Sequence, residues 1–199
     1  DESALRGRLL SRLAIALYFT HARERMELLS QQAVFAARQG NDPITLAEAL
    51  KAQYYALWDP DHLDERLAIA AEMLQLAEAA GVKEWAFQGH WWRFLAVFEL
   101  GDRLAVDREF HTCARLAEEL RQPYYHWVRC NLQLLCTVSE GRFVEAERLA
   151  QEGLVIGQQT QGPNANIFFM GQLFYIRKEQ GRLLEFEDGF RGYVEAFPN

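Results

Sequence analysis

Apolar residues recur along this chain at helical spacing. Between residues 63 and 77, Leu63, Leu67, Ala70 and Met73 follow one another at intervals of three or four residues. That spacing places them on one face of an amphipathic helix. No segment between turn-forming residues alternates strictly between apolar and polar positions, as a half-buried strand would. The pattern therefore predicts an all-α fold without a sheet.

The turn-forming residues repeat every 40 positions. Gly101, Gly141 and Gly181 stand in similar turns and are spaced by 40 residues. Stepping back by the same interval reaches Asp61 and His21, where we expect equivalent breaks between helices. A fixed period of tens of residues is typical of a repeat architecture in which each unit buries its apolar face against the next.

A second junction lies within each period. The helices that follow it are led by Pro43, Lys83, Pro123 and Pro163. Proline suits a first helical position, because the N–H that it lacks would be unpaired there. We expect Gly40 and Gly81 to close the preceding helices, because glycine readily adopts a positive φ. Each period thus holds two helices.

Residues 1–199 are therefore predicted to form one solenoid domain of about five helical hairpins. The expected helices are 4–19, 22–39, 43–58, 63–80, 83–100, 103–120, 123–140, 143–160, 163–180 and 183–197. Small residues that allow helices to approach closely recur in two columns. These columns are Ala16, Ala56, Ala96 and Cys136 in the first helices, and Ala37, Ala77, Ala117 and Gly157 in the second helices.

Composition and charge narrow the function. With 28 acidic and 21 basic residues, the net charge of −7 disfavours binding to nucleic acid or anionic lipid. No uninterrupted apolar run approaches the roughly 20 residues that span a bilayer. Three cysteines and no signal-peptide pattern favour free thiols in a reducing cytoplasm. Because the chain begins at Asp1 and ends directly after an apolar helix, we expect it to be a fragment of a longer multidomain protein.

The segment 140–150, with Gly141, Phe143 and Ala146, resembles the turn and second helix of a tetratricopeptide repeat, and 101–117 and 181–193 are weaker copies. The period of 40 exceeds the usual length of about 34. The runs 49–63 and 117–123 resemble the tetratricopeptide region of large bacterial signalling ATPases.

This resemblance implies a right-handed α-α superhelix that acts as a regulatory arm. Proteins of that kind join such repeats to a nucleotide-binding switch domain and to a LuxR-type DNA-binding or cyclase domain. The fragment has no P-loop pattern, so no nucleotide site carries over.

The histidines and cysteines do not predict chemistry. His111 with Cys113, and His126 with Cys130, are the candidate pairs, but two ligands do not make a structural metal site. Neither pair is accompanied by a glycine-rich oxyanion turn, which a cysteine nucleophile would need. We predict no enzyme activity, no metal and no cofactor.

Aromatic residues are the most informative candidates, because they concentrate in the first helices of pairs two to five. In a tetratricopeptide arrangement those helices line a concave groove. The residues expected to face it are Lys51, Tyr55, Trp58, Gln88, Trp91, Asn131 and Tyr175. Aromatic rings interleaved with amide and cationic groups suit a peptide or a small polar ligand such as a sugar. The competing interpretation is that these aromatic rings fill the hairpin cores.

Three functions follow from these features. The leading hypothesis is a non-catalytic interaction module that binds a protein, a peptide or another domain of its own chain. The alternative is a sensor that binds a small molecule in the concave groove. A third is a structural spacer or oligomerisation arm, which would tolerate Trp91→Ala and Tyr55→Ala without losing a binding event.

Overall fold

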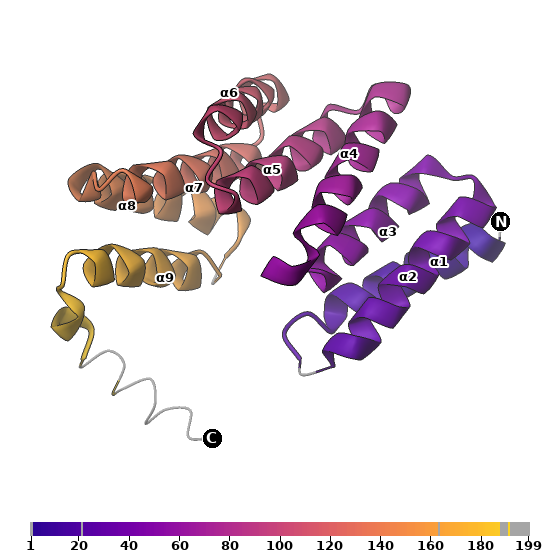
Figure 1. Cartoon of the computed structure of the whole chain (residues 1–199), viewed down its shortest axis with the longest axis horizontal. Helices are drawn as coiled ribbons and strands as arrows, with labels where there is room; N and C mark the ends of the chain where they lie inside the picture. The colour runs from indigo at the N-terminus through magenta and orange to yellow at the C-terminus, as the bar shows by residue number, and fades with distance from the viewer. Residues whose placement is uncertain (1, 21, 163, 188–190, 192–199) are drawn as a thin grey trace. The chain divides into compact units, whose positions relative to one another are not determined.

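The computed structural model describes residues 2–20, 22–162, 164–187 and 191, and these residues form helices and turns without any strand (Figure 1). This confirms the predicted all-α fold. In the described part of the chain the helices are α1 Glu2–Ala16, α2 Arg23–Gly40, α3 Pro43–Ala56, η1 Pro60–His62, α4 Leu63–Ala80, α5 Lys83–Glu99, α6 Arg103–Leu120, α7 Pro123–Ser139, α8 Phe143–Thr160, α9 Asn164–Glu179 and η2 Leu183–Phe186.

Three predicted helices differ clearly from the observed ones. The helix expected over 4–19 spans Glu2–Ala16, and the chain then continues in turns closed by hydrogen bonds between residues three apart. The helix expected over 43–58 ends at Ala56, because the Asp59-Pro60 step disfavours a helical conformation before the proline and starts η1 instead. The described part of the helix expected over 183–197 includes the short 3-10 helix η2, and most of the remainder lies outside the described residues. The expected break at His21 and helix start at Pro163 also lie outside them.

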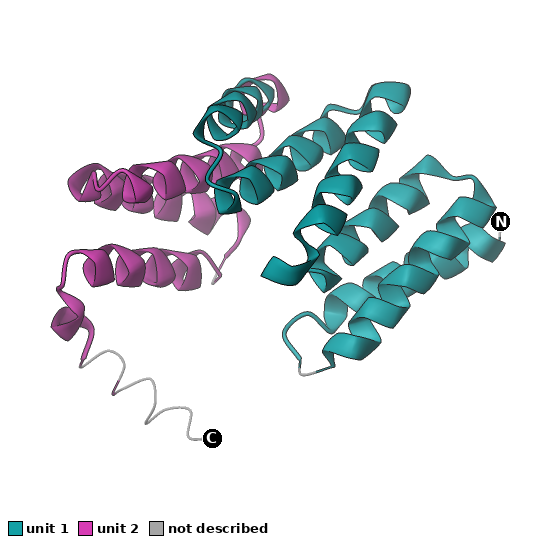
Figure 2. Ribbon diagram, in the orientation of Figure 1, with its two compact units in different colours: residues 1–116 teal, residues 117–199 magenta. Residues whose placement is uncertain are grey.

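Residues 1–116 and 117–199 form two compact units (Figure 2). In the first unit, α1, α2 and α3 pack against one another, and α4 packs between α3 and α5. Its core includes Ala33, Ala37, Leu50, Tyr54 and Met73. In the second unit, α8 packs against both α7 and α9. Whether residues 1–199 unfold as one domain stays a prediction.

The second column of small residues lies where helices meet. Ala37, Ala77, Ala117 and Gly157 are all buried. Gly157 is the most constrained, because an added Cβ would lie 2.7 Å from Trp127 Nε1. In the first column Ala56 and Ala96 are buried and Cys136 is partly buried. Ala16 is exposed, contrary to the expected packing, because it is the last residue of α1.

Left-handed turn conformations recur at the 40-residue period, except that Gln161 has φ −112° and Gly162 takes the positive φ in its place. Gly101, Gly141 and Gly181 adopt φ values of 71°, 73° and 70°. At the other junction, Asn41, Gly81 and Arg121 adopt φ values of 48°, 66° and 52°. The prediction that Gly40 closes its helix through a positive φ was wrong by one position: Gly40 is still helical and Asn41 takes the left-handed conformation. Asparagine tolerates this conformation because its short polar side chain can hydrogen-bond locally.

We expect Gly157→Ala to lower the free energy of unfolding by about 1–3 kcal/mol, because the new methyl group overpacks the contact with Trp127. Gly171→Ala is the matched control: it is also helical, and an added Cβ there meets nothing within 4 Å. The free energy of unfolding of the control should rise by about 0.5–1 kcal/mol, because alanine has a higher helix propensity than glycine. Urea unfolding followed by circular dichroism measures both, and equal effects would contradict the tight approach of α7 and α8.

Candidate functional site

The seven predicted groove residues are distributed over both units. Lys51, Tyr55 and Trp58 lie on or directly after α3, and Gln88 and Trp91 lie on α5. In the second unit, Asn131 lies on α7 and Tyr175 on α9. Five of the seven therefore lie on or next to α3 and α5 of the first unit, and the surface of these two helices is the candidate site.

A stacked aromatic pair joins α3 to α5. The rings of Tyr54 and Trp92 lie 4.3 Å apart between centroids, with an interplanar angle of 9°. The Tyr54 hydroxyl donates a hydrogen bond to the Trp92 carbonyl at 3.4 Å, and both side chains are fully buried. Because successive helical residues point about 100° apart, Tyr55 and Trp91 flank this pair, and both are partly buried. The stack therefore fixes the distance between the predicted groove residues of α3 and those of α5.

Trp58 is the exposed end of this aromatic cluster. Its ring meets Tyr54 edge-on with centroids 5.6 Å apart, and 41% of the residue is exposed. The guanidinium carbon of Arg66, on α4, lies 5.7 Å from the Trp58 ring centroid. This distance is within the range of a cation–π contact. Trp58 thus exposes part of its ring to solvent while the rest packs against Tyr54 and Arg66.

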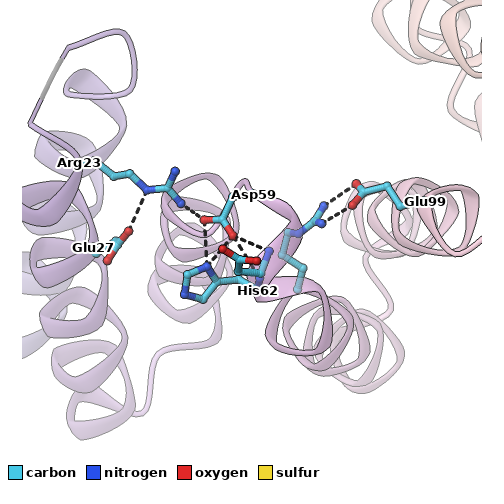
Figure 3. A network of polar contacts seen from close by, with 7 residues as sticks. Arg23, Glu27, Asp59, His62 and Glu99 are labelled. Carbon is cyan, nitrogen blue, oxygen red and sulfur yellow. Dashed lines mark hydrogen bonds and ion pairs between the residues drawn. The ribbon is translucent and has the colours of Figure 1, made fainter.

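Arg66 is a buried cation with a specific partner. It is 1% exposed, and its two terminal nitrogens donate to the two carboxylate oxygens of Glu99 at 2.8 and 2.5 Å (Figure 3). These hydrogen bonds raise the pKa of Arg66 above its ordinary value. The paired hydrogen bonds connect α4 to the end of α5 and stabilise the guanidinium beside Trp58.

Asp59 fixes the turn that carries Trp58. It accepts hydrogen bonds from the backbone N–H groups of Asp61 and His62 at 2.9 and 3.1 Å, and its carboxylate lies 2.7 Å from His62 Nδ1. It also forms an ion pair with Arg23 of α2, which contacts Glu27 in turn (Figure 3). The segment between α3 and α4 is therefore tied to α2 by charge as well as by packing.

Two buried donors on α5 lack hydrogen-bond partners. Gln88 Nε2 and Trp92 Nε1 are both shielded from solvent and unpaired in the structure. Their spacing of four residues puts them on one face of α5. A buried donor without an acceptor costs about 1–3 kcal/mol, so an acceptor that reached these groups would bind favourably.

Lys51 lies in a partly buried position on α3. Burial is the largest effect on its amine and lowers its pKa below the ordinary value; nearby Glu48 acts in the opposite direction and Arg12 lowers it further. The environment therefore disfavours the charged amine more than Glu48 stabilises it.

In the second unit, the predicted residues are engaged differently. Asn131 Oδ1 accepts a hydrogen bond of 2.6 Å from Gln172 Nε2 on α9. Tyr175 is 61% exposed, and its ring lies edge-on to Phe174. Asn131 therefore contributes to the α7–α9 contact, and Tyr175 is available on the surface.

Sequence reasoning missed Tyr54, Trp92, Arg66 and Glu99 as parts of this cluster. A signal for Arg66 was present in the period of 40. Its equivalents Met26, Val106 and Ala146 are apolar and are at most 4% exposed, so Arg66 is a cation in a core column. A charge in such a column needs a partner. The spacing from Arg66 to Glu99 does not follow the period, so the sequence did not indicate which acid it would be.

Cys113 and Cys130 are buried in the structure, and burial raises the pKa of both thiols. Such thiols are poor nucleophiles, because the thiolate is the reactive form. Among the residues that the structure describes, no three His, Cys, Asp or Glu side chains come together as metal ligands. Within the same described part, none of the helices has the length and apolarity that crossing a membrane requires.

In comparisons with known proteins, no family model and no curated protein matches the sequence of this chain.

We expect Glu99→Gln to lower the free energy of unfolding by about 1–2 kcal/mol, because the buried guanidinium loses its charged acceptor while the exposure of Glu99 screens part of the effect. Glu78→Gln, at an exposed position on α4, should change it by less than about 0.5 kcal/mol. Urea titrations measure the free energy of unfolding of both variants. A Glu99 variant as stable as the control would show that the ion pair with Arg66 does not stabilise the fold.

Replacing Lys51 with Met should change the pH dependence of stability. A lysine whose folded pKa is depressed holds its proton less tightly in the folded state, so the free energy of unfolding rises with pH between the folded pKa and the ordinary value of 10.5. Lys51→Met should be more stable than wild type at pH 7, and the difference should narrow as the pH approaches 10.5.

Urea unfolding between pH 7 and 10.5 tests this expectation, with Lys178→Met as the control at an exposed lysine. A difference between wild type and Lys51→Met that stays constant over this range would show that the amine is not penalised in the fold.

Proposed function

We propose that this chain is a non-catalytic, regulatory protein-interaction module that recognises its partner through the aromatic surface of α3 and α5. The observation that carries the proposal is the arrangement at Trp58: a large, partly exposed ring is fixed on a fully buried base made by Tyr54, Trp92 and Arg66. Tryptophan, tyrosine and arginine are the residues that most often dominate binding energy at protein interfaces.

Rigidity is what makes this surface suited to binding. A side chain that is already held in one conformation loses little entropy when a partner covers it. The Trp58 ring packs against Tyr54 and Arg66, which are themselves fixed by the stack on Trp92 and the ion pair with Glu99. The hydrogen bonds of Asp59 fix the backbone turn that follows Trp58. The half-buried Tyr55 and Trp91 extend the same surface along α3 and α5.

The expected partner is a protein, a peptide or another domain of the same polypeptide. The resemblance to the helical arms of bacterial signalling and transcriptional regulators supports a regulatory role in the cytoplasm. The net charge of −7 argues against nucleic acid as the ligand of this segment. The burial of Cys113 and Cys130, with raised thiol pKa values, supports a role without covalent catalysis.

A small-molecule sensor is the second candidate, and the unpaired donors of Gln88 and Trp92 favour it. Because both atoms are buried, a ligand with carbonyl or hydroxyl oxygens could reach them only if the packing around α5 opened. At 100 times its dissociation constant, such a ligand would stabilise the fold by about 2.7 kcal/mol, which a thermal-shift screen of sugars and nucleotides detects.

The test of the interaction proposal is a selection of peptides from a displayed library on the purified chain. Trp58→Ala and Trp91→Ala should each weaken the selected peptides at least tenfold, because each removes about 1.4 kcal/mol or more from a central contact. Fluorescence anisotropy with the labelled peptides measures the affinities.

Leu104→Ala on α6 is the matched control, since Leu104 is 72% exposed and lies outside the aromatic surface. It should leave the affinities within about twofold. Peptides that bind all three variants equally well, with the folds shown intact by circular dichroism, would contradict recognition through α3 and α5. A selection that yields no peptide while a sugar or nucleotide stabilises the chain would favour the sensor.

A further inference from the structure

The first hairpin carries a second apolar surface, separate from the α3–α5 site. On α1, Leu5, Leu9 and Leu13 are 59%, 61% and 42% exposed, and on α2, Leu28 and Phe35 are 55% and 68% exposed. We call these five residues the outer α1–α2 face. Leucines at intervals of four residues on α1 form a continuous stripe along one side of that helix.

The 40-residue period shows what covers this stripe in the other hairpins. Leu5 and Leu9 correspond to Thr45 and Ala49 of α3, which are completely buried. Thr45 lies against α1, where its Cγ2 is 2.8 Å from the position of a Cβ added to Gly7. In α3 the stripe positions are thus where the preceding hairpin packs.

The same comparison in α5 identifies the kind of helix that packs there. Gly89 is the equivalent of Leu9, and a Cβ added to it would lie 2.7 Å from the Leu74 side chain and 3.2 Å from the Ala70 carbonyl of α4. Gly7 and Leu9 are two residues apart and so point about 200° apart around α1. Since Gly7 faces α3, Leu9 faces away from it and is left exposed.

A groove beside the stripe extends the surface onto α2. It has a volume of about 370 Å³, and its lining includes Arg6 of α1 with Leu28 and Phe35 of α2. Leu28 and Phe35 are unusual for their columns, whose other members are Ala68, Gln75, Arg108, Arg115, Arg148 and Val155. Ala68 and Val155 are smaller apolar residues and the other members are polar or charged, so the large apolar surface of α2 at this groove is particular to the first hairpin.

The first 40 residues have a positive net charge, whereas the chain as a whole is negative. Residues 1–40 contain six arginines and four acidic residues, a net charge of +2, in a chain whose net charge is −7. Arg6 and Arg12 are exposed on α1, whereas Arg8 forms an ion pair with Glu48 of α3. A partner that covers the stripe places its own edges next to these cations.

We propose that the outer α1–α2 face binds an acidic, alanine-rich amphipathic helix of a partner protein, of the kind that α4 presents to α5. The helix α4 has the required chemistry: Ala70 and Leu74 face α5, and its 18 residues contain four acidic side chains and one arginine. The α4 helix of a second copy is not the occupant, because it is already packed between its own α3 and α5. The proposal does not depend on recognition through Trp58.

The probe for this test is a synthetic peptide with the sequence of residues 63–80, capped at both ends and labelled with fluorescein. We expect saturable binding to the whole chain at low salt, measured by fluorescence anisotropy, that weakens as salt is added. Leu9→Gln and Phe35→Gln should each reduce the affinity at least tenfold. Leu104→Gln, at a similarly exposed leucine of α6, should leave it within about twofold.

A control peptide in which Asp64, Glu65, Glu72 and Glu78 are replaced by their amides tests the charge complementarity, and it should bind at least tenfold more weakly. No saturation up to about 1 mM peptide, or equal binding by Leu9→Gln, would overturn the proposal. Self-association of the chain in sedimentation velocity that disappears in Leu9→Gln would also overturn it, because the face would then bind a second copy. These outcomes are independent of the Trp58 and Trp91 variants.

Discussion

Close approach of helix backbones is the constraint on which this structure depends. Small residues return at a 40-residue interval where one helix crosses the next, and Gly157 shows how little space remains there. Each hairpin buries its apolar side against neighbouring hairpins. Between α3 and α5 this contact is made by the buried Tyr54–Trp92 stack, whereas Leu5 and Leu9 of α1 are exposed at positions whose equivalents in α3 are small and buried.

The Arg66–Glu99 pair adds specificity to a core that is otherwise aliphatic and aromatic. A buried guanidinium is costly to desolvate, and a hydrophobic residue in its place, as in the other repeats, would be at least as stable. Its two hydrogen bonds nevertheless join α4 to the end of α5. The same cation lies beneath Trp58, so the interaction that joins the two helices also supports the proposed binding surface.

Much of the fold could be predicted from the sequence, because turns and helix starts depend on local residues. The glycines at 101, 141 and 181 and the prolines at 43 and 123 stand where the period placed them. The site was less accessible, because stacking between Tyr54 and Trp92 depends on which faces of two helices meet. Counting by 40 identified their neighbours Tyr55 and Trp91. The contacts of Tyr54 with Trp92 and of Arg66 with Glu99 join residues 38 and 33 positions apart, which does not match the period.

The placement of the buried cysteines has a consequence for how the chain opens. Cys113 belongs to the first compact unit and Cys130 to the second, and both are nearly inaccessible in the native state. Each thiol can react with an alkylating reagent only when its own surroundings unfold. Their labelling rates therefore report separately on the two halves of the array. Equal rates would mean that the halves open together, and unequal rates would mean that one frays while the other stays folded.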